Sequence, residues 1–431
     1  MHNPFIETNL TIIDSVMGRG KSTWAINHIN STLDENFIIV VPTLDEVERY
    51  HSALTRPSFT PNYDDGIKQA GLQDRFRDLV EQNRTIVTTH RMLTCWSLDT
   101  LEILRNRHYT LILDEVTDLV KPFAGIGKRD YQLLFNDHVV AEEIQDDGLV
   151  RLIVGDKAYS TSEDDNKILK FSAFMEAVKA GNIYKLRDSF FIWVGSAERF
   201  RIFNNVFIMT YLFKGSVMDA WLNYHNDSYH MKSIVDRKLV DYIDEGGQEF
   251  KHLINLVEDK KLNHIGRKRH LSSSWFKNAR PEDLIILKKN LKIFFKNTGV
   301  EAKYCMWSIF KDVAKSIAPI GFTTTNKYNL TSALKLSTKE RAEVLCYVPV
   351  NMKASNHYRH KKAVAICVNY YPFPSISTFF QDIDIPFDTD RFALSEMIQV
   401  IWRSGIREGE SIDLYIPSER MRNLFKLWLE K

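Results

Sequence analysis

The segment "SVMGRGKST", residues 15–23, constrains this chain more than any other because it has the form of a phosphate-binding loop. In such a loop, backbone N–H groups and a helix N-terminus surround the phosphates, so a strand must precede it and a helix must follow. The apolar run "LTIID" and the segment "TWAINHIN" meet both conditions. Ser15 replaces the usual first glycine, which is a mild change because the positions nearest the phosphates are intact. A surface turn containing Gly-Lys-Ser by chance is the alternative.

Chain length and net charge limit the number of domains and the kinds of partner that we expect. A chain of 431 residues exceeds the size at which one core keeps growing, so we expect two or three domains. The formal net charge is only +2, so affinity for a polyanion has to come from local clusters of basic residues. No apolar run approaches the ~20 residues that span a bilayer, and we expect a cytoplasmic protein without a membrane segment.

The cysteines are scattered and form no C-x-x-C pair, which argues against a zinc site and a disulfide framework. They are Cys95, Cys305, Cys346 and Cys367.

Apolar, β-rich runs alternate with helix-prone segments over residues 10–225, which predicts an α/β fold with a largely parallel sheet. The runs are "LTIIDSV", "NFIIVVPT", "RTIVTTH", "YTLILDEV", "SFFIWVGS" and "VFIMTYLF". Residues of about 125–190 interrupt this pattern and are expected to form an insertion with a hairpin at "GLVRLIVGDKAYS". A basic, mainly helical linker is expected over 226–298, and a second α/β domain over 299–431.

A second motif lies at the end of the run "YTLILDEVTD". A buried strand would deliver Asp114 and Glu115 to its C-terminal edge, where α/β sheets bind ligands. We expect Asp114 to hold Mg²⁺ and Glu115 to polarise the attacking water. A helix cap or a solvated turn is the alternative for an isolated Asp-Glu pair.

The loop itself provides the expected contacts to ATP. Lys21 would reach the β- and γ-phosphates, and the Ser22 hydroxyl would join Asp114 at the metal. The expected ATP-binding residues are Gly18, Arg19, Gly20, Lys21, Ser22 and Thr23.

Near the C-terminus, Gln399, Arg403 and Arg407 are spaced four apart, which predicts one shared helix face. A γ-phosphate across a domain cleft is a suitable partner for these two guanidinium groups. The alternative is that both arginines are ordinary surface or ion-paired residues.

In this order the motifs resemble those of a superfamily 2 helicase. "GRGKST" resembles motif I, "VVPT" motif Ia, "VTTHRML" motif Ib, "LDEV" motif II of the DEAD/DEAH class, and Gln399, Arg403 and Arg407 motif VI. The segment "NMKASNHYRHKKAVAICVNYYPFP" is similar to helicase-like replication proteins of bacteriophages and mobile elements. Thr117 in motif II and Thr210 in the motif III position depart from the family pattern.

The resemblance implies two RecA-like P-loop NTPase domains, one over 1–225 with motifs I to III and one over 299–431 with motifs V and VI. It also implies an ATP- and Mg²⁺-dependent helicase or translocase of phage or mobile-element replication or recombination. In a virus its location would be the host cytoplasm, and replication proteins are possible partners.

Nucleic acid, DNA rather than RNA, is the expected partner. Hydroxyl, amide and basic side chains at strand ends and in the second domain would contact its phosphates, namely Thr43, Thr89, His90, Lys353, Asn356 and Arg359. A helix cap is the alternative for each such threonine or asparagine. The basic segment 260–296, with Trp275 and Phe276, fits a single-strand channel or equally a solvated helix face with buried rings.

Alternative functions from other classes remain. A viral packaging ATPase would share motifs I and II, a P-loop kinase would not need the second domain, and a clamp or loader would bind nucleotide without unwinding.

Overall fold

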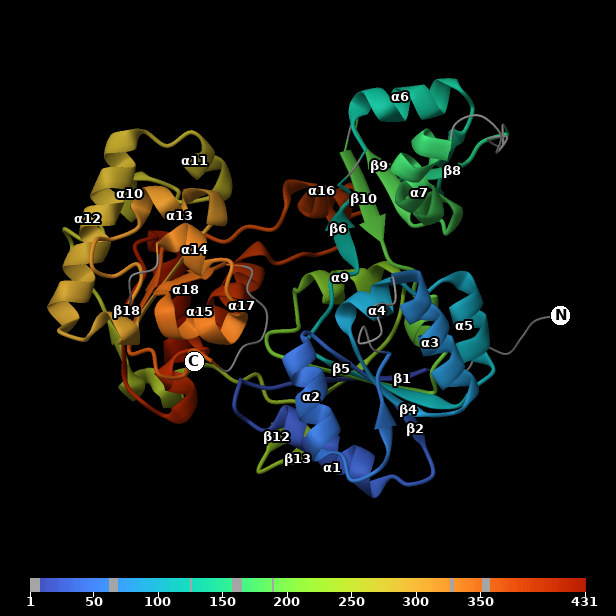
Figure 1. Ribbon diagram of the computed structural model, residues 1–431, viewed down its shortest axis with the longest axis horizontal. Coiled ribbons are helices and arrows are strands. Elements are labelled where there is room, and N and C mark those ends of the chain that lie inside the picture. The colour runs from blue at the N-terminus through green and yellow to red at the C-terminus, as the bar shows by residue number, and fades with distance from the viewer. Residues whose placement is uncertain are drawn as a thin grey trace. The chain divides into compact units, whose positions relative to one another are not determined.

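A computed structural model describes residues 8–61, 69–124, 126–156, 165–187, 190–325, 329–350 and 357–431 (Figure 1). This part of the chain divides into two compact units. The first unit comprises Met1–Asp14, Gly20–Tyr242 and Pro372–Asp388. The second unit comprises Ser15–Arg19, Ile243–Tyr371 and Thr389–Lys431.

The central sheet of the first unit has the strand order β13-β12-β1-β11-β5-β2-β4-β3. Its ladders are parallel except for the β12–β13 hairpin. The strands are β1 (Asn9–Asp14), β2 (Asn36–Val41), β3 (Ser58–Phe59), β4 (Thr85–Thr89), β5 (Tyr109–Asp114), β11 (Asn205–Thr210), β12 (His230–Val235) and β13 (Lys238–Asp241).

Helices cover both faces of this sheet, which is why its strands are apolar at successive positions. Ile12 packs into the core on one face and Ile13 into the core on the other. Figure 1 shows α1 and α2 on one side of the sheet and α3 and α5 on the opposite side. The helices are α1 (Lys21–Ser31), α2 (Leu44–Ala53), α3 (Gln69–Glu81), α4 (His90–Thr94), α5 (Leu98–Arg105), α8 (Glu198–Arg201) and α9 (Val217–Tyr224).

A separate antiparallel sheet, in the order β6-β10-β9-β8-β7, lies between β5 and α8 in the sequence. Its apolar face packs against α6 and α7, with Leu134 and Phe174 in one core. The run "SFFIWVGS" forms β10 of this sheet, so its expected place in the parallel sheet was wrong. The elements are β6 (Val120–Pro122), α6 (Lys128–Asn136), β7 (Val140–Ile144), β8 (Val150–Val154), α7 (Asp165–Lys179), β9 (Ile183–Leu186) and β10 (Phe190–Val194).

The second unit contains a parallel sheet in the order β14-β18-β17-β15-β16. Its strands are β14 (Ile254–Leu256), β15 (Cys305–Ile309), β16 (Tyr347–Pro349), β17 (Ala363–Ile366) and β18 (Ile412–Tyr415). Its helices are η1 (Gln248–Leu253), α10 (His264–Lys268), α11 (Ser273–Lys277), α12 (Pro281–Thr298), η2 (Ala302–Tyr304), α13 (Lys311–Ile317), α14 (Leu330–Ala333), α15 (Thr338–Val344), α17 (Thr389–Ile401), η3 (Gly405–Glu408) and α18 (Glu419–Glu430).

The region expected as a linker, 226–298, is shared between the units. Strands β12 and β13 extend the first sheet, whereas β14 pairs with β18 in the second. These three strands have six, four and three residues, and their mixed polar and apolar sequences show no clear alternation. In this region the boundary between the units lies between Tyr242 and Ile243. No separate linker spans the described residues 226–298.

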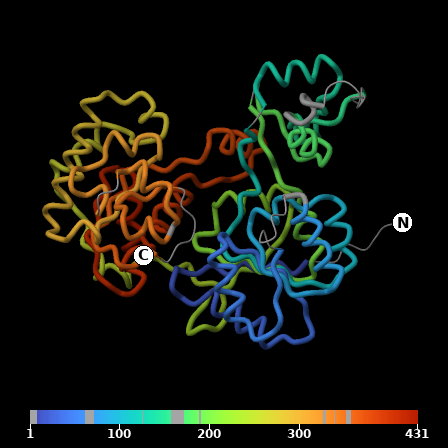
Figure 2. The backbone as a smooth tube through the Cα atoms, viewed as in Figure 1, coloured from blue at the N-terminus to red at the C-terminus, as the bar shows by residue number. Residues whose placement is uncertain are grey.

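One segment of the first unit, Pro372–Asp388, interrupts the second unit in the sequence (Figure 2). It carries α16 (Pro374–Asp382), whose Ile376, Phe379 and Phe380 join the core of the first unit. Full burial of an apolar side chain of this size contributes roughly 1.5–3 kcal/mol of stability. The segment is therefore packed structure and not a loose connection.

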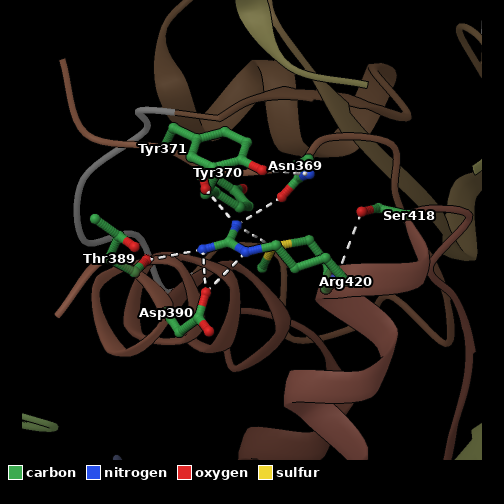
Figure 3. A network of polar contacts seen from close by, with 8 residues as sticks. Asn369, Tyr370, Tyr371, Thr389, Asp390, Ser418 and Arg420 are labelled. Carbon is green, nitrogen blue, oxygen red and sulfur yellow. Dashed lines mark hydrogen bonds and ion pairs between the residues drawn. The ribbon is translucent and has the colours of Figure 1, made fainter. Parts of the chain in front are cut away.

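Arg420 of α18 holds both ends of this segment within the second unit (Figure 3). Its Nη1 donates to Asn369 Oδ1 at 2.7 Å and to the Tyr370 carbonyl at 2.9 Å. Its Nη2 donates to the Thr389 carbonyl at 3.0 Å and pairs with Asp390 at 2.6 Å. The planar fork of arginine suits such divergent acceptors.

Replacement of Arg420 should destabilise the second unit. In Arg420→Met the carbonyls of Tyr370 and Thr389 lose a charged donor, so we expect the free energy of unfolding to fall by about 2–4 kcal/mol. Denaturant unfolding measures this loss. Lys426→Met on the same helix is the control, because its ion pair with Glu258 is exposed and is worth at most about 1 kcal/mol. Equal losses in the two variants would refute the role of Arg420.

Candidate functional site

The phosphate-loop segment has the backbone that its glycines predict. Gly18 and Gly20 have φ of 91° and 88°, in the left-handed region that glycine adopts without strain. Ser15 is fully buried, which suits a small side chain. Gly20 is the N-cap of α1, so Lys21 is the first helical residue. A helix that starts directly after a glycine-rich turn is the arrangement by which phosphate sites bind an anion.

Ser22 and Asp114 come together at the edge of the first sheet. The Ser22 hydroxyl donates to Asp114 Oδ2 at 2.8 Å. Asp114 is the last residue of β5, and Lys21 and Asp114 are 8% and 7% exposed. A hydroxyl and a carboxylate oxygen so close together are ligands of the kind that Mg²⁺ prefers. These residues therefore fit a magnesium ion bound together with a nucleotide.

Glu115 follows in an unusual conformation. Its φ is 76°, and its N–H donates to the Met209 carbonyl of β11 at 2.9 Å. A non-glycine residue in the left-handed region carries strain, and such strain clusters at functional sites. The backbone turn directs the chain away from the strand directly after Asp114.

Helix α2 adds two side chains to Asp114 that the sequence analysis missed. Tyr50 donates its hydroxyl to Asp114 Oδ2 at 2.9 Å, and Arg49 Nη2 lies 3.3 Å from the same oxygen. Arg49 also pairs with Glu46 at 2.6 Å. Burial raises the pKa of Tyr50 well above its ordinary value, and the Asp114 carboxylate adds to this shift. The signal in the sequence was the i, i+3, i+4 spacing of Glu46, Arg49 and Tyr50 on one helix face.

A further contact joins β1 to the loop after β11. Asp14 Oδ1 accepts from the Leu212 N–H at 2.9 Å, and Oδ2 accepts from the Phe213 N–H at 3.0 Å. Asp14 is 3% exposed, so these bonds satisfy a buried carboxylate. The residue before the phosphate loop thus holds the segment "MTYLF", which contains Thr210 at the expected motif III position. No pattern in the sequence indicates this pairing.

Three predicted nucleic-acid-binding residues lie in the first unit. Thr43 caps α2 by accepting the Glu46 N–H at 3.4 Å. Thr89 is half-buried and lines a small cavity. His90 is 6% exposed, and its Nε2 lies 3.2 Å from the Asp114 carbonyl oxygen. The cap that was the alternative for Thr43 is present, and His90 supports the backbone of Asp114.

The arginines of the motif VI segment are placed differently from expectation. Helix α17 ends at Ile401, before Arg403, and Arg407 lies in η3. The expected shared helix face was therefore wrong, because the Gly405 N–H leaves the helical pattern and donates to the Lys361 carbonyl at 2.9 Å. Arg403 is 7% exposed and Arg407 is exposed, while Gln399 is half-buried on α17.

The remaining expected contacts lie in the second unit. Arg359 is exposed and pairs with Glu408 at 2.8 Å. Lys353 and Asn356 lie outside the described residues. In the basic segment 260–296, Phe276 is 6% exposed and stacks edge-on against Phe310, so this ring is part of the core.

Within the described chain, every helix is too short or too polar to cross a membrane. The same residues contain no cluster of three or more His, Cys, Asp or Glu arranged to hold a metal ion by themselves.

Comparisons with known proteins agree with this architecture. The SPbeta prophage-derived protein YonV of Bacillus subtilis (strain 168) is 30% identical over 441 residues, covering 97% of this chain and 98% of the relative. Residues 248–429 match the model of the YonV C-terminal Rossmann-like domain. The solved structure "XPD_APO" is similar with a TM-score of 0.53 at 13% identity, covering 98% of this chain and 95% of that chain.

A second solved structure, "Structure of S. tokodaii Xpd4", gives a TM-score of 0.49 at 13% identity over 97% of this chain and 93% of that chain. The two-domain α/β fold, which the motifs predicted, is confirmed by the likeness to the first structure.

Removing the Tyr50 hydroxyl should destabilise the first unit. In Tyr50→Phe the buried Asp114 carboxylate loses a donor, so we expect the free energy of unfolding to fall by about 1.5–3 kcal/mol. Tyr109→Phe is the control, since its hydroxyl donates to the neutral carbonyl of Arg84 and should cost only about 1 kcal/mol. Denaturant unfolding compares the two, and an equal or smaller loss for Tyr50→Phe would contradict this account.

Proposed function

Because the chain belongs to the YonV family of prophage-derived proteins and has the fold of the superfamily 2 helicase XPD, we propose that it is an ATP-dependent DNA helicase or translocase. The observation that carries the proposal is the 2.8 Å contact between Ser22 and Asp114, next to a buried Lys21. These are the lysine, hydroxyl and acid that P-loop nucleoside triphosphatases use. The contact favours a nucleotide-hydrolysing enzyme over a clamp that only binds nucleotide.

In this proposal the backbone and side chains of residues 18–23 bind the phosphates of ATP. Ser22 and Asp114 hold Mg²⁺, which neutralises charge on the β- and γ-phosphates when bound. Glu115 polarises the attacking water, for which its position directly after Asp114 is suitable. Gln399, Arg403 and Arg407 complete the site by stabilising charge that develops on the γ-phosphate.

The proposed nucleic-acid contacts are made to phosphates. Thr89 at the start of α4 and Arg359 in the second unit are accessible enough for this role. Thr43, Lys353 and Asn356 would extend the same backbone contacts, and His90 would act through the position of its main chain. Phosphate contacts hold a strand in register without reading its sequence, as movement along DNA requires. The prophage origin of the relative supports a role in phage DNA replication or recombination, together with replication proteins.

The ATPase site can be tested directly. We expect ATP hydrolysis by the full chain to rise when single-stranded DNA is added. Lys21→Ala and Asp114→Asn should each lower the DNA-stimulated rate by on the order of 100-fold or more, because each removes charge stabilisation at the phosphates. Lys426→Ala, on an exposed face of α18, should keep the wild-type rate. Wild-type turnover in Lys21→Ala would remove the site assignment.

The DNA contact predicts a change in salt dependence. Arg359→Ala should weaken single-stranded DNA binding and reduce the slope of log affinity against log salt by about 0.7, since one phosphate contact is lost. Glu408→Gln should strengthen binding, because it releases Arg359 from its ion pair. Fluorescence anisotropy at several salt concentrations measures both effects. An unchanged slope in Arg359→Ala would exclude this residue from the interface.

A further inference from the structure

Asp114 is surrounded by more donors than a metal-binding carboxylate needs. Three described side chains point to its Oδ2 atom, with donor distances of 2.8 Å from Ser22 Oγ, 2.9 Å from Tyr50 Oη and 3.3 Å from Arg49 Nη2. A carboxylate oxygen offers about two lone-pair directions. The third donor therefore competes for the same electron density that a metal or its bound water would use.

The three donors differ in whether they tolerate a divalent cation. Ser22 can keep its bond, because a hydroxyl that gives its lone pair to a metal still donates its proton to Asp114. Tyr50 is neutral, and its buried hydroxyl adds no positive charge. Arg49 is a permanent cation, and its charge would lie within a few ångströms of a doubly charged ion. Like charges at such separations repel strongly in a partly buried site.

Arg49 already has a second partner on its own helix. Its Nη2 lies 2.6 Å from Glu46 Oε2, one turn earlier on α2. The side chain of Arg49 is 37% exposed, whereas those of Glu46 and Asp114 are 12% and 10% exposed. The guanidinium can therefore leave Asp114 toward solvent while it keeps its pair with Glu46, and no buried charge loses its only partner.

We propose that Arg49 is a resident counter-cation of Asp114 that competes with the divalent metal for this carboxylate. This inference rests on the proposed function, since it concerns the metal of the ATP site. In the metal-free protein Arg49 neutralises Asp114 and holds α2 against the sheet edge. Metal binding displaces Arg49 to Glu46, and by reciprocity the presence of Arg49 weakens metal binding.

The competition between Arg49 and the metal links the metal site to helix α2. Thr43, the N-cap of this helix, ends the segment "VVPT" that is proposed to contact nucleic acid. Arg49 and Tyr50 lie on the same helix and face Asp114, so loading of the site loosens one of two side-chain contacts between α2 and this carboxylate. Tyr50 keeps the helix in place throughout.

The test measures metal binding and not turnover. Free Mn²⁺ is followed by electron paramagnetic resonance with the full chain and saturating ADP, for the wild type, Arg49→Gln, Arg49→Lys and Arg56→Gln. Arg49→Gln should bind Mn²⁺ on the order of five-fold more tightly, the size of effect expected for a partly exposed charge. Arg49→Lys keeps the positive charge and should stay near the wild type.

Arg56→Gln is the matched control, because Arg56 donates to the Thr32 carbonyl and not to a carboxylate. It should leave Mn²⁺ affinity unchanged. If Arg49→Gln bound Mn²⁺ as tightly as the wild type or more weakly, the proposal that Arg49 competes with the metal would be wrong.

Asp114→Asn separates this inference from the proposed function. It should lose Mn²⁺ binding in the presence of ADP. If it retained wild-type binding, the assignment of the metal site would fail. If Asp114→Asn loses Mn²⁺ while Arg49→Gln binds it as the wild type does, only the role of Arg49 fails.

Discussion

The first unit depends on how a buried carboxylate is satisfied at the end of β5. Asp114 is 7% exposed, and a charge so far from water is costly unless donors surround it. Those donors come from the start of α1, through Ser22, and from one face of α2, through Arg49 and Tyr50. His90, at the start of α4, contacts the carbonyl of the same residue. Segments that follow three different strands are thus fixed around one residue.

The parallel register places the other important residues at the same edge. Asp14 pairs with Thr210 across β1 and β11, and Met209 pairs with Asp114 across β11 and β5. Because neighbouring parallel strands end together, the acid before the phosphate loop and the acid of the second motif come to one rim of the sheet. The chain then turns sharply at Glu115 and Leu212, which have φ of 76° and 59°. Both turns place a non-glycine residue in the left-handed region, and hydrogen bonds to Asp14 hold the Leu212 turn.

The sequence analysis predicted the features that depend on residues close together in the chain. It missed the features that depend on packing between distant elements. Strands buried on both faces are recognisable as apolar runs, and the proximity of Ser22 to Asp114 follows from two motifs at strand ends. The residues of a strand do not determine which other strand it pairs with. The apolar run of β10 was therefore assigned to the parallel sheet, although β10 lies in the antiparallel sheet. The i+4 spacing of Arg403 and Arg407 suggested one helix, but α17 ends at Ile401. Arg49 and Tyr50 escaped notice because their role depends on which sheet edge α2 covers.

Arg420 shows how a long excursion of the chain can remain well defined. The residues before Pro372 and after Asp388 both meet this one guanidinium, so the two ends of the excursion are held side by side. Because Arg420 holds the two ends of the segment together, the segment forms a closed loop. Closing the loop reduces the conformational freedom of the residues within it, α16 included. At the far end Phe379 stacks edge-on against Tyr184 and Tyr224, which fixes the helix in the core of the first unit. Hydrogen bonds at its base and ring contacts of its helix therefore leave this segment little of the conformational freedom that an unrestrained loop of the same length would have.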